Sequence, residues 1–237
     1  MRKAVILAAG RGTRMGKLTE RVPKPLLPIL GRPLLLHVLD RLQAAGISEV
    51  LVVTGYGATA VERELRGHPL VPQFVRQDPI DGTAHAAALA EEFVGQESFL
   101  LTFADILADP ADYQRAMAAL EEKVEAVVAV KWVVDPTQGA AVYEAEGRVV
   151  KIIEKPAPGT STTHWNSAGI YCFRPSIFPE LRRVPRSPRG EYELTSAVEQ
   201  LVEAGKWVRP YVLQGIWLDV GRPEDIAVAE QLLVSSR

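Results

Sequence analysis

The stretch "KAVILAAGRGTRMG", residues 3–16, joins an apolar run directly to a glycine-rich segment. A short apolar run that ends at glycine is typical of a strand that is buried on both faces of a sheet. A glycine-rich turn after such a strand lets backbone N–H groups approach an anion, commonly a phosphate. The stretch therefore predicts a central first strand with an anion-binding loop at its carboxyl end.

Strand-like and helix-like segments alternate through the first half of the chain. Buried strands are predicted at 3–9, 49–55, 70–77, 98–105 and 125–133. Helices are predicted at 33–46, 58–67, 83–93 and about 110–122, and no helix is expected between the glycine-rich loop and Pro33. This alternation predicts an α/β fold with a Rossmann-like, doubly wound and mostly parallel sheet. Ligands of such sheets bind beyond the carboxyl ends of the strands, so one cleft is expected to collect Gly10, Gln77 and Asp105.

The pattern changes after residue 135. The segment "AAVYEAEGRVVKIIEKP", residues 140–156, contains two strand-like runs around "EAEG", which predicts an antiparallel hairpin. Further strands are predicted at 167–173 and within 207–221, and helices at 192–205 and 223–233. We therefore expect a single domain over residues 1–237, in which the second half adds an antiparallel elaboration to the same sheet.

Charge and hydropathy limit the class of partner. Lys and Arg total 27 against 29 Asp and Glu, a formal net charge of −2, which gives no footprint for a nucleic-acid partner or a membrane surface. No apolar run approaches the roughly 20 residues that span a bilayer, and the first ten residues are too short for a signal sequence. A cytoplasmic protein without a membrane partner is expected.

Three residue types predict little chemistry of their own. The single Cys172 excludes an internal disulfide and is expected to be buried and inert. The four histidines are far apart in the sequence, so a histidine-based metal site is not expected. The arginine run "RRVPRSPR", residues 182–189, is broken by two prolines and is interpreted as a solvated loop.

The glycine-rich loop fails the spacing of two familiar phosphate-binding motifs. A Walker A loop would need Ser or Thr after Gly16-Lys17, where this chain has Leu18. The dinucleotide fingerprint G-x-G-x-x-G fails because Met15 stands at its third glycine. The loop and the segment after it instead carry five cations, namely Arg11, Arg14, Lys17, Arg21 and Lys24. Such a set suits a substrate with several phosphates, for example a nucleoside triphosphate.

Motifs along nearly the whole chain resemble those of the sugar-1-phosphate nucleotidyltransferases, such as glucose-1-phosphate thymidylyltransferase and N-acetylglucosamine-1-phosphate uridylyltransferase. "LAAGRGTRM" followed by "PKPLLPI" is similar to the signature of this family. Later family landmarks follow in order, as "QDPIDGTAHA", "FAD", "IIEKP", "NSAGIY" and "WLDVGRPED". The resemblance implies attack of a sugar-1-phosphate on the α-phosphorus of an NTP, which gives an NDP-sugar and pyrophosphate.

The resemblance also implies roles for residues on the nucleotide side. Arg14 is expected to stabilise the departing pyrophosphate, and Lys24 to bridge the α-phosphate and the incoming sugar phosphate. The nucleotide itself is expected to contact Leu7, Ala8, Ala9, Gly10, Gly12, Thr13, Gln77, Gly82 and Thr83. These residues place a nucleotide-binding part at about residues 1–134 of the nucleotidyltransferase domain.

A sugar-phosphate-binding part is implied at about residues 135–221. Its expected contacts are Gly139, Glu154, Lys155, Asn166 and Gly169. Asn166 lies three residues before Gly169, where the family usually has a spacing of two. Asp105 and Asp219 are expected to hold Mg²⁺, and Ala104 precedes Asp105 where the family often has glycine.

The substrates expected from the resemblance are dTTP or UTP and glucose-1-phosphate. N-acetylglucosamine-1-phosphate and N-acetylmuramate-1-phosphate stay open, and a homo-oligomer is a further expectation because the family often forms one. Two other functions are kept as alternatives. One is a cytidylyltransferase for phosphocholine or a polyol phosphate, which often has P-K-A-L where this chain has Pro25. The other is a catalytically silent regulatory homologue, which would be expected to lose the charged residues retained here.

Overall fold

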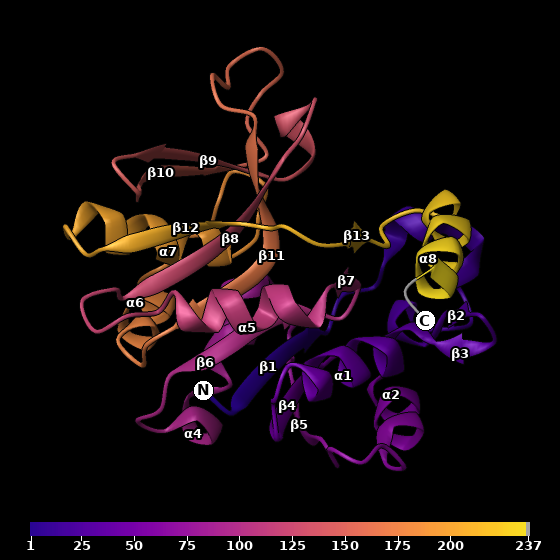
Figure 1. Ribbon diagram of the computed structural model, residues 1–237. Coiled ribbons are helices and arrows are strands. Elements are labelled where there is room, and N and C mark those ends of the chain that lie inside the picture. The colour runs from indigo at the N-terminus through magenta and orange to yellow at the C-terminus, as the bar shows by residue number, and fades with distance from the viewer. Residues whose placement is uncertain (236–237) are drawn as a thin grey trace.

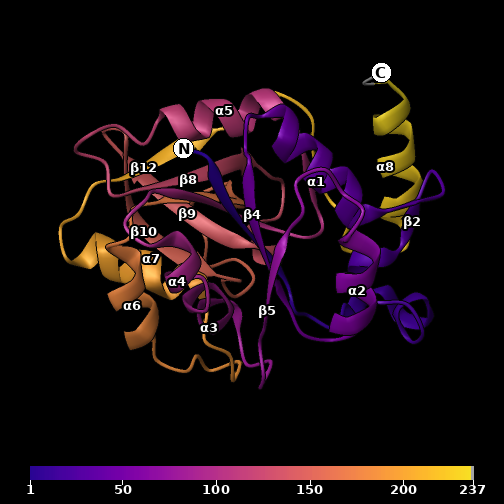
Figure 2. The same cartoon turned by 90° about the horizontal axis from the view of Figure 1, so that it is seen from below.

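The computed structural model describes residues 1–235, so the last two residues of the expected 1–237 domain lie outside the described residues. One large sheet runs through the molecule, with helices on both of its faces (Figures 1 and 2). Its strands are β1 (Lys3–Ala8), β4 (Glu49–Thr54), β5 (Gln73–Arg76), β6 (Phe99–Phe103), β8 (Ala126–Trp132), β9 (Ala140–Ala145), β10 (Arg148–Glu154), β11 (Trp165–Phe173) and β12 (Val208–Val212).

The sheet combines a parallel half and an antiparallel half. The order β6-β1-β4-β5 is parallel throughout, and β1 is its centre. On the other side β11 runs antiparallel to β6, β8 and β9, while β10 pairs antiparallel with β9 and β12 pairs parallel with β8. The predicted α/β fold with a mostly parallel sheet and an antiparallel elaboration is confirmed.

One strand lies elsewhere than the simple alternation suggests. The pattern places the strand at 125–133 next in the parallel series after β6. In the structure β11 lies between β6 and β8 and is antiparallel to both. The later half of the chain is thus inserted into the sheet beside the first half.

Alternating side chains of β1 divide the core between the two faces of the sheet. Ala4 and Ile6 pack with α1 (Leu34–Ala44), α2 (Ala58–Leu65) and α5 (Pro110–Ala118). Val5 and Leu7 pack on the other face with α3 (Thr83–Ala88), α4 (Glu91–Val94), α6 (Ile177–Arg183) and α7 (Leu194–Glu203). Burial on both faces explains why β1 is apolar at every position after Lys3.

Short elements account for most differences from the sequence expectations. The loop after β1 is not free of helix, because 3-10 turns form at Thr13–Thr19 and Lys24–Leu26. The helix expected at 83–93 is split into α3 and α4, and α5 ends at Ala118. The expectations missed α6 and three short strands, β2 (Pro28–Ile29), β3 (Arg32–Pro33) and β7 (Ile106–Ala108). A further 3-10 turn covers Pro136–Gln138.

The end of the chain returns to the first half of the molecule. Strand β13 (Trp217–Asp219) pairs antiparallel with β7, and α8 (Glu224–Ser235) then packs beside β2 (Figure 1). The Leu30 N–H donates to Glu230 Oε1 at 3.0 Å, which ties α8 to the β2–β3 turn. Within residues 1–235, no helix combines the length and the apolar character that a membrane crossing requires.

Candidate active site

A cavity of about 840 Å³ opens at the carboxyl ends of β1 and β6 and extends under the antiparallel half of the sheet. Gly10, Gln77 and Asp105 all line it, as expected from their places after strands. Every residue with a predicted role contributes to its wall, namely Leu7, Ala8, Ala9, Gly10, Gly12, Thr13, Arg14, Lys24, Gln77, Gly82, Thr83, Asp105, Gly139, Glu154, Lys155, Asn166, Gly169 and Asp219. The individual roles stay predictions.

The glycine-rich loop is held by its own backbone around a buried methionine. The Met15 N–H and the Thr19 hydroxyl both donate to the Gly12 carbonyl oxygen, at 2.9 and 3.0 Å. Gly12 has φ +67°, and a Cβ there would lie 2.8 Å from Lys24 Cβ. Glycine is therefore required at this position both for the turn and for the close approach of Lys24. The fold of the loop leaves Arg14 exposed at the cavity.

Lys24 is buried and forms an ion pair with Asp105. The 3-10 turn that begins at Lys24 places its side chain beneath the loop, and Asp105 follows directly after β6. A buried cation without a counter-charge would be costly, so the pair accounts for the burial of Lys24. The pair also places an ammonium group and a carboxylate next to each other in the cavity wall.

Asp219 lies beside Asp105 because β13 pairs with β7. Asp219 is opposite Ile106 in this ladder, and the Val220 N–H donates to the Asp105 carbonyl oxygen at 2.9 Å. Burial, reinforced by the negative charge of Asp105, raises the pKa of Asp219 to about 6. The buried Asp219 Oδ1 has no hydrogen-bond partner among the described residues.

This carboxylate pair fits a divalent cation. Oxygen ligands are those that Mg²⁺ prefers, and a cation would satisfy the orphaned Oδ1 atom and offset the repulsion between the two carboxylates. Across residues 1–235, no group of three or more His, Cys, Asp and Glu side chains is arranged to hold a metal. Substrate phosphate oxygens and water would have to supply the other ligands.

The segment 77–83 is fixed against the loop that precedes α7. The Gln77 side-chain amide donates to the Gly82 carbonyl oxygen at 2.8 Å and to Asp81 at 3.2 Å. A Cβ on Gly82 would lie 2.2 Å from the Tyr192 carbonyl oxygen, so only glycine fits there. Thr83 Oγ1 accepts a 2.9 Å hydrogen bond from Leu194 N at the start of α7. These residues therefore connect the two halves of the cavity wall, a structural role that their motif does not indicate.

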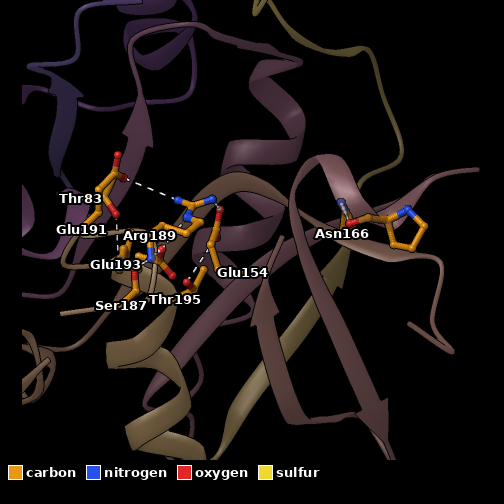
Figure 3. A network of polar contacts seen from close by, with 10 residues as sticks. Thr83, Glu154, Asn166, Ser187, Arg189, Glu191, Glu193 and Thr195 are labelled. Carbon is orange, nitrogen blue, oxygen red and sulfur yellow. Dashed lines mark hydrogen bonds and ion pairs between the residues drawn. The ribbon is translucent and has the colours of Figure 1, made fainter. Parts of the chain in front are cut away.

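Arg189 connects three carboxylates in the wall of the cavity (Figure 3). Its guanidinium lies 2.9 Å from Glu193, 3.6 Å from Glu191 and 3.8 Å from Glu154. Thr195 donates a hydrogen bond to Glu154 at 3.3 Å. Burial raises the pKa of Glu154, and the charge of Arg189 partly opposes that shift.

Asn166 lies on β11, apart from the Arg189 network (Figure 3). Its Nδ2 donates to the Pro136 carbonyl oxygen at 3.2 Å, and its side chain is buried. Asn166 Oδ1 has no hydrogen-bond partner in the described part of the chain. The asparagine thus presents a free acceptor at the cavity wall, close to Gly139, where a Cβ would lie 2.8 Å from Asn166 Nδ2.

The sequence expectations missed several cavity residues. Lys131, Arg189, Glu193, Trp217 and Asp225 also line the cavity. The interpretation of 182–189 as a solvated loop agrees with the exposed Arg186 and Arg189, although Arg189 also lines the cavity. It is wrong for Arg182 and Arg183, which are exposed but form the last turn of α6. Proximity of Trp217 to the Asp219 motif could have indicated its place, whereas no local pattern indicates that Lys131 or Arg189 points into the cavity.

Lys131 differs from an ordinary surface lysine in its burial and in its pKa. Its ammonium nitrogen lies 3.1 Å from the centroid of the Trp217 ring, and burial lowers its pKa to about 8 despite the nearby carboxylates of Asp219 and Asp225. The single Cys172 is buried in β11, as expected.

Comparisons with known proteins agree with this geometry. The model of a family described as nucleotidyl transferase matches residues 3–236. The chain is 34% identical to the UTP–glucose-1-phosphate uridylyltransferase AglF of Haloferax volcanii, over 98% of this chain and 96% of that one. It is 36% identical to the bifunctional protein GlmU of Methanocaldococcus jannaschii over 98% of its own length, but it spans only 54% of that relative.

A solved structure shows the same fold. A UDP-glucose pyrophosphorylase complexed with UDP-glucose superposes with a TM-score of 0.86 and 23% identity, and the match covers 100% of both chains. The family resemblance carried by the sequence motifs is confirmed by the family model and by the curated relatives. The chain therefore belongs to the nucleotidyl transferase family, and within it to the sugar-1-phosphate nucleotidyltransferases, enzymes that form NDP-sugars.

Proposed function

We propose that the protein transfers the nucleotidyl group of UTP or dTTP to glucose-1-phosphate and releases pyrophosphate. The observation that carries the proposal is a single cavity that joins the glycine-rich loop, the Lys24–Asp105 pair, Asp219 and Glu154. The relative AglF, named for UTP and glucose-1-phosphate, supports the choice of these substrates. Either pyrimidine nucleotide is compatible with the motifs that carry the family resemblance.

The proposed chemistry needs charge neutralisation rather than a general base. A sugar phosphate is already anionic at neutral pH, so it can attack the α-phosphorus without losing a proton to the protein. Two anions must approach each other, and cations between them lower the repulsion. Lys24 is proposed to lie between the α-phosphate and the sugar phosphate, and Arg14 to stabilise the charge on pyrophosphate as it leaves.

The loop and the base segment are proposed to hold the NTP. Gly10, Gly12 and Thr13 would bind the triphosphate through N–H and hydroxyl donors, and the backbone of Leu7, Ala8 and Ala9 would face the base and ribose. Gln77, Gly82 and Thr83 would contact the base edge. Because the Gln77 amide nitrogen already donates to Gly82 and Asp81, its side-chain oxygen is the atom left to accept from a pyrimidine.

The antiparallel half is proposed to hold the sugar phosphate. Glu154 and Asn166 Oδ1 would accept hydrogen bonds from sugar hydroxyls, and Lys155 would bind the phosphate. Gly139 and Gly169 would allow close approach of the backbone. On this basis we place the nucleotide-binding part at about residues 1–134 and the sugar-phosphate-binding part at about residues 135–221.

Enzymes of this family generally use a divalent metal ion, and Mg²⁺ is the ion that we propose here. Asp105 and Asp219 would hold it, because they are adjacent, oxygen-only donors with an unsatisfied acceptor atom. When bound, such an ion supplies charge neutralisation and alignment of the phosphates. The Lys24 ammonium would then be free to turn from Asp105 toward substrate phosphate.

The first test is pyrophosphate release in the presence of Mg²⁺, measured over UTP, dTTP, CTP, ATP and GTP against several sugar-1-phosphates. Release is expected with UTP or dTTP and glucose-1-phosphate, and its loss in Lys24→Ala would assign it to this site. Phosphocholine and a polyol phosphate belong in the same grid, because release with CTP and either of them would establish a cytidylyltransferase. A folded protein that binds NTP and releases no pyrophosphate in any combination would instead be a regulatory homologue.

A further inference from the structure

Lys131 is a cation of the cavity wall for which the described reaction has no use. It lies on β8 and contributes to the cavity lining. Within residues 1–235, no hydrogen bond or salt bridge occupies its ammonium group, whose close contact is the face of the Trp217 ring, 3.1 Å from the centroid. By contrast, Lys24 is paired with Asp105 and Arg189 with Glu193.

The sheet fixes the direction of this lysine. Lys131 is directly opposite Asn166 in the antiparallel β8–β11 ladder, so both side chains lie on the same face of the sheet. Asn166 is 3% exposed, its Oδ1 atom has no partner within the described structure, and it lines the same cavity. An ammonium donor and a carbonyl acceptor are therefore presented side by side to whatever enters the sugar half.

Trp217 holds the lysine near the carboxylate pair. The indole N–H donates to the Ala168 carbonyl oxygen at 2.8 Å, which fixes the ring. Trp217 and Asp219 are two residues apart on β13, so their side chains lie on the same side of that strand. The ammonium group of Lys131 therefore lies on the side of β13 that carries the Asp219 carboxylate.

The incoming sugar phosphate brings a further anion next to Asp105 and Asp219. Lys24 and Lys155 are already proposed to approach it, and a third cation would lower the repulsion further. A half-buried ammonium group binds phosphate more strongly than a fully exposed one, because its charge is less screened by water.

We propose that Lys131 binds the phosphate of the sugar-1-phosphate and positions it for attack on the α-phosphorus. This inference rests on the proposed function. It adds a residue of β8 to the proposed contacts from the loop and from β10. The contact is ionic, and no bond to Lys131 forms or breaks in the reaction.

Steady-state kinetics with UTP, glucose-1-phosphate and Mg²⁺ provide the test. Lys131→Met keeps a long side chain against Trp217 and removes the charge, so the KM for glucose-1-phosphate is expected to rise on the order of 10-fold or more. The KM for UTP is expected to stay within about twofold, and Lys131→Arg should recover part of the loss. Calorimetric titration with glucose-1-phosphate gives a second readout that does not depend on turnover.

Lys151→Met is the matched control. Lys151 is an exposed lysine of β10 whose ammonium lies 6.0 Å from the Tyr143 ring centroid, outside the cavity lining. Its loss should leave both KM values unchanged. Thermal unfolding of all variants checks their folding, and Lys131→Gln replaces Lys131→Met if the latter does not fold.

The possible outcomes separate the two proposals. An unchanged KM for glucose-1-phosphate in Lys131→Met would overturn the role of Lys131 and leave the proposed function standing. A rise confined to the KM for UTP would also overturn it, because the lysine would then serve the triphosphate. A wild-type protein that neither turns over nor binds glucose-1-phosphate would overturn both.

Discussion

The glycine-rich loop and the Arg189 network differ in how far their polar side chains are paired with one another. In the loop, the exposed Thr13 and Arg14 make no side-chain hydrogen bond to any other described residue. In the opposite part of the cavity lining, Glu154, Arg189 and Glu193 form one bonded network with Thr195 (Figure 3). The loop is thus held by contacts to its own backbone, whereas the Arg189 network is fixed by pairs between side chains.

Substitutions in the loop and in the Arg189 network should therefore have different effects on stability. A cation that contacts only substrate can be removed at little cost in stability, and its loss should appear in the rate. A cation that also neutralises buried carboxylates should affect both stability and binding. The following predictions test that contrast.

The largest effect is expected for Arg14→Ala. Its loss should lower kcat by about 10²–10³-fold, or about 2.7–4 kcal/mol, because the charge on departing pyrophosphate would be left unbalanced. The temperature of unfolding should fall only slightly, since the exposed Arg14 side chain makes no hydrogen bond within the described chain and its charge acts only on the nearby Asp219 carboxylate. Single-turnover kinetics and differential scanning calorimetry measure the two quantities. Lys17→Ala, at an exposed position of the same loop outside the cavity lining, is the control.

The next prediction concerns the carboxylate pair of Asp105 and Asp219. Asp219→Asn should change how the free energy of unfolding depends on pH. The pKa of Asp219 is raised from 3.8 to about 6 in the folded protein, so its contribution to stability is fully present below 3.8 and is lost as pH rises through 6. Near pH 7.5 in metal-free buffer, Asp219→Asn should be more stable than the wild type by on the order of 1–3 kcal/mol. Near pH 4 this advantage should disappear.

Urea unfolding at the two pH values, with EDTA present, measures this difference. Addition of Mg²⁺ at the higher pH should stabilise the wild type and not the variant. Equal stability of the two proteins at both pH values would show that burial and the charge of Asp105 do not destabilise the ionised Asp219.

Arg189→Met is expected to have smaller effects, on both the free energy of unfolding and the KM for glucose-1-phosphate. Loss of the guanidinium leaves Glu193 and Glu154 without their cation, so the free energy of unfolding should fall by about 1 kcal/mol, limited by the partial exposure of the pair. The KM for glucose-1-phosphate should rise by roughly fivefold as Glu154 loses its fixed position. Arg186→Met, which changes an exposed arginine of the same loop, is the control. A rise in the KM of Arg189→Met without any fall in its free energy of unfolding would show that Arg189, like Arg14, adds little to stability.

The smallest effect is expected for Thr83→Val. The hydroxyl accepts from Leu194 N at the start of α7, and loss of such a cap costs about 0.5–1 kcal/mol. The KM for UTP should change by less than about threefold, since the hydroxyl is already bonded to Leu194 N and the proposed contact of Thr83 with the base edge does not depend on it. Guanidinium unfolding and steady-state kinetics measure the two quantities, with Thr83→Ser as the variant that keeps the hydroxyl. A large increase in the KM for UTP would instead show that the Thr83 hydroxyl itself binds the base.

Local patterns predicted the central strands because strands buried on both faces are apolar throughout, as in β1. The pairing of strands was beyond such patterns, since nothing in the apolar run of β11 specifies that it lies between β6 and β8. Likewise β7 and β13 are three residues long and exist only through their mutual pairing. The split between α3 and α4 has no breaker residue in "TAHAAALAEEFV" to announce it.

The residues of the site also divide into those that local motifs predict and those that depend on long-range pairing. Contiguous motifs pointed to the cavity residues of the loop and of strand ends such as Asp105 and Asp219, all of which line one cavity. Proline and arginine alone indicate the exposed loop that holds Arg189, but its place in the cavity wall depends on Glu154 from another element. Lys131 sits in a strand whose other side chains are mostly buried, and only the register with Asn166 shows which way it points.

The β7–β13 ladder has a consequence for the life of the chain on the ribosome. Asp105 is synthesised early, but Asp219 reaches it only when the last part of the chain has emerged and paired with β7. A nascent or prematurely terminated polypeptide that already carries the complete glycine-rich loop would therefore lack half of the carboxylate pair. Such a fragment would have to expose the edge of β7 that β13 covers in the finished protein.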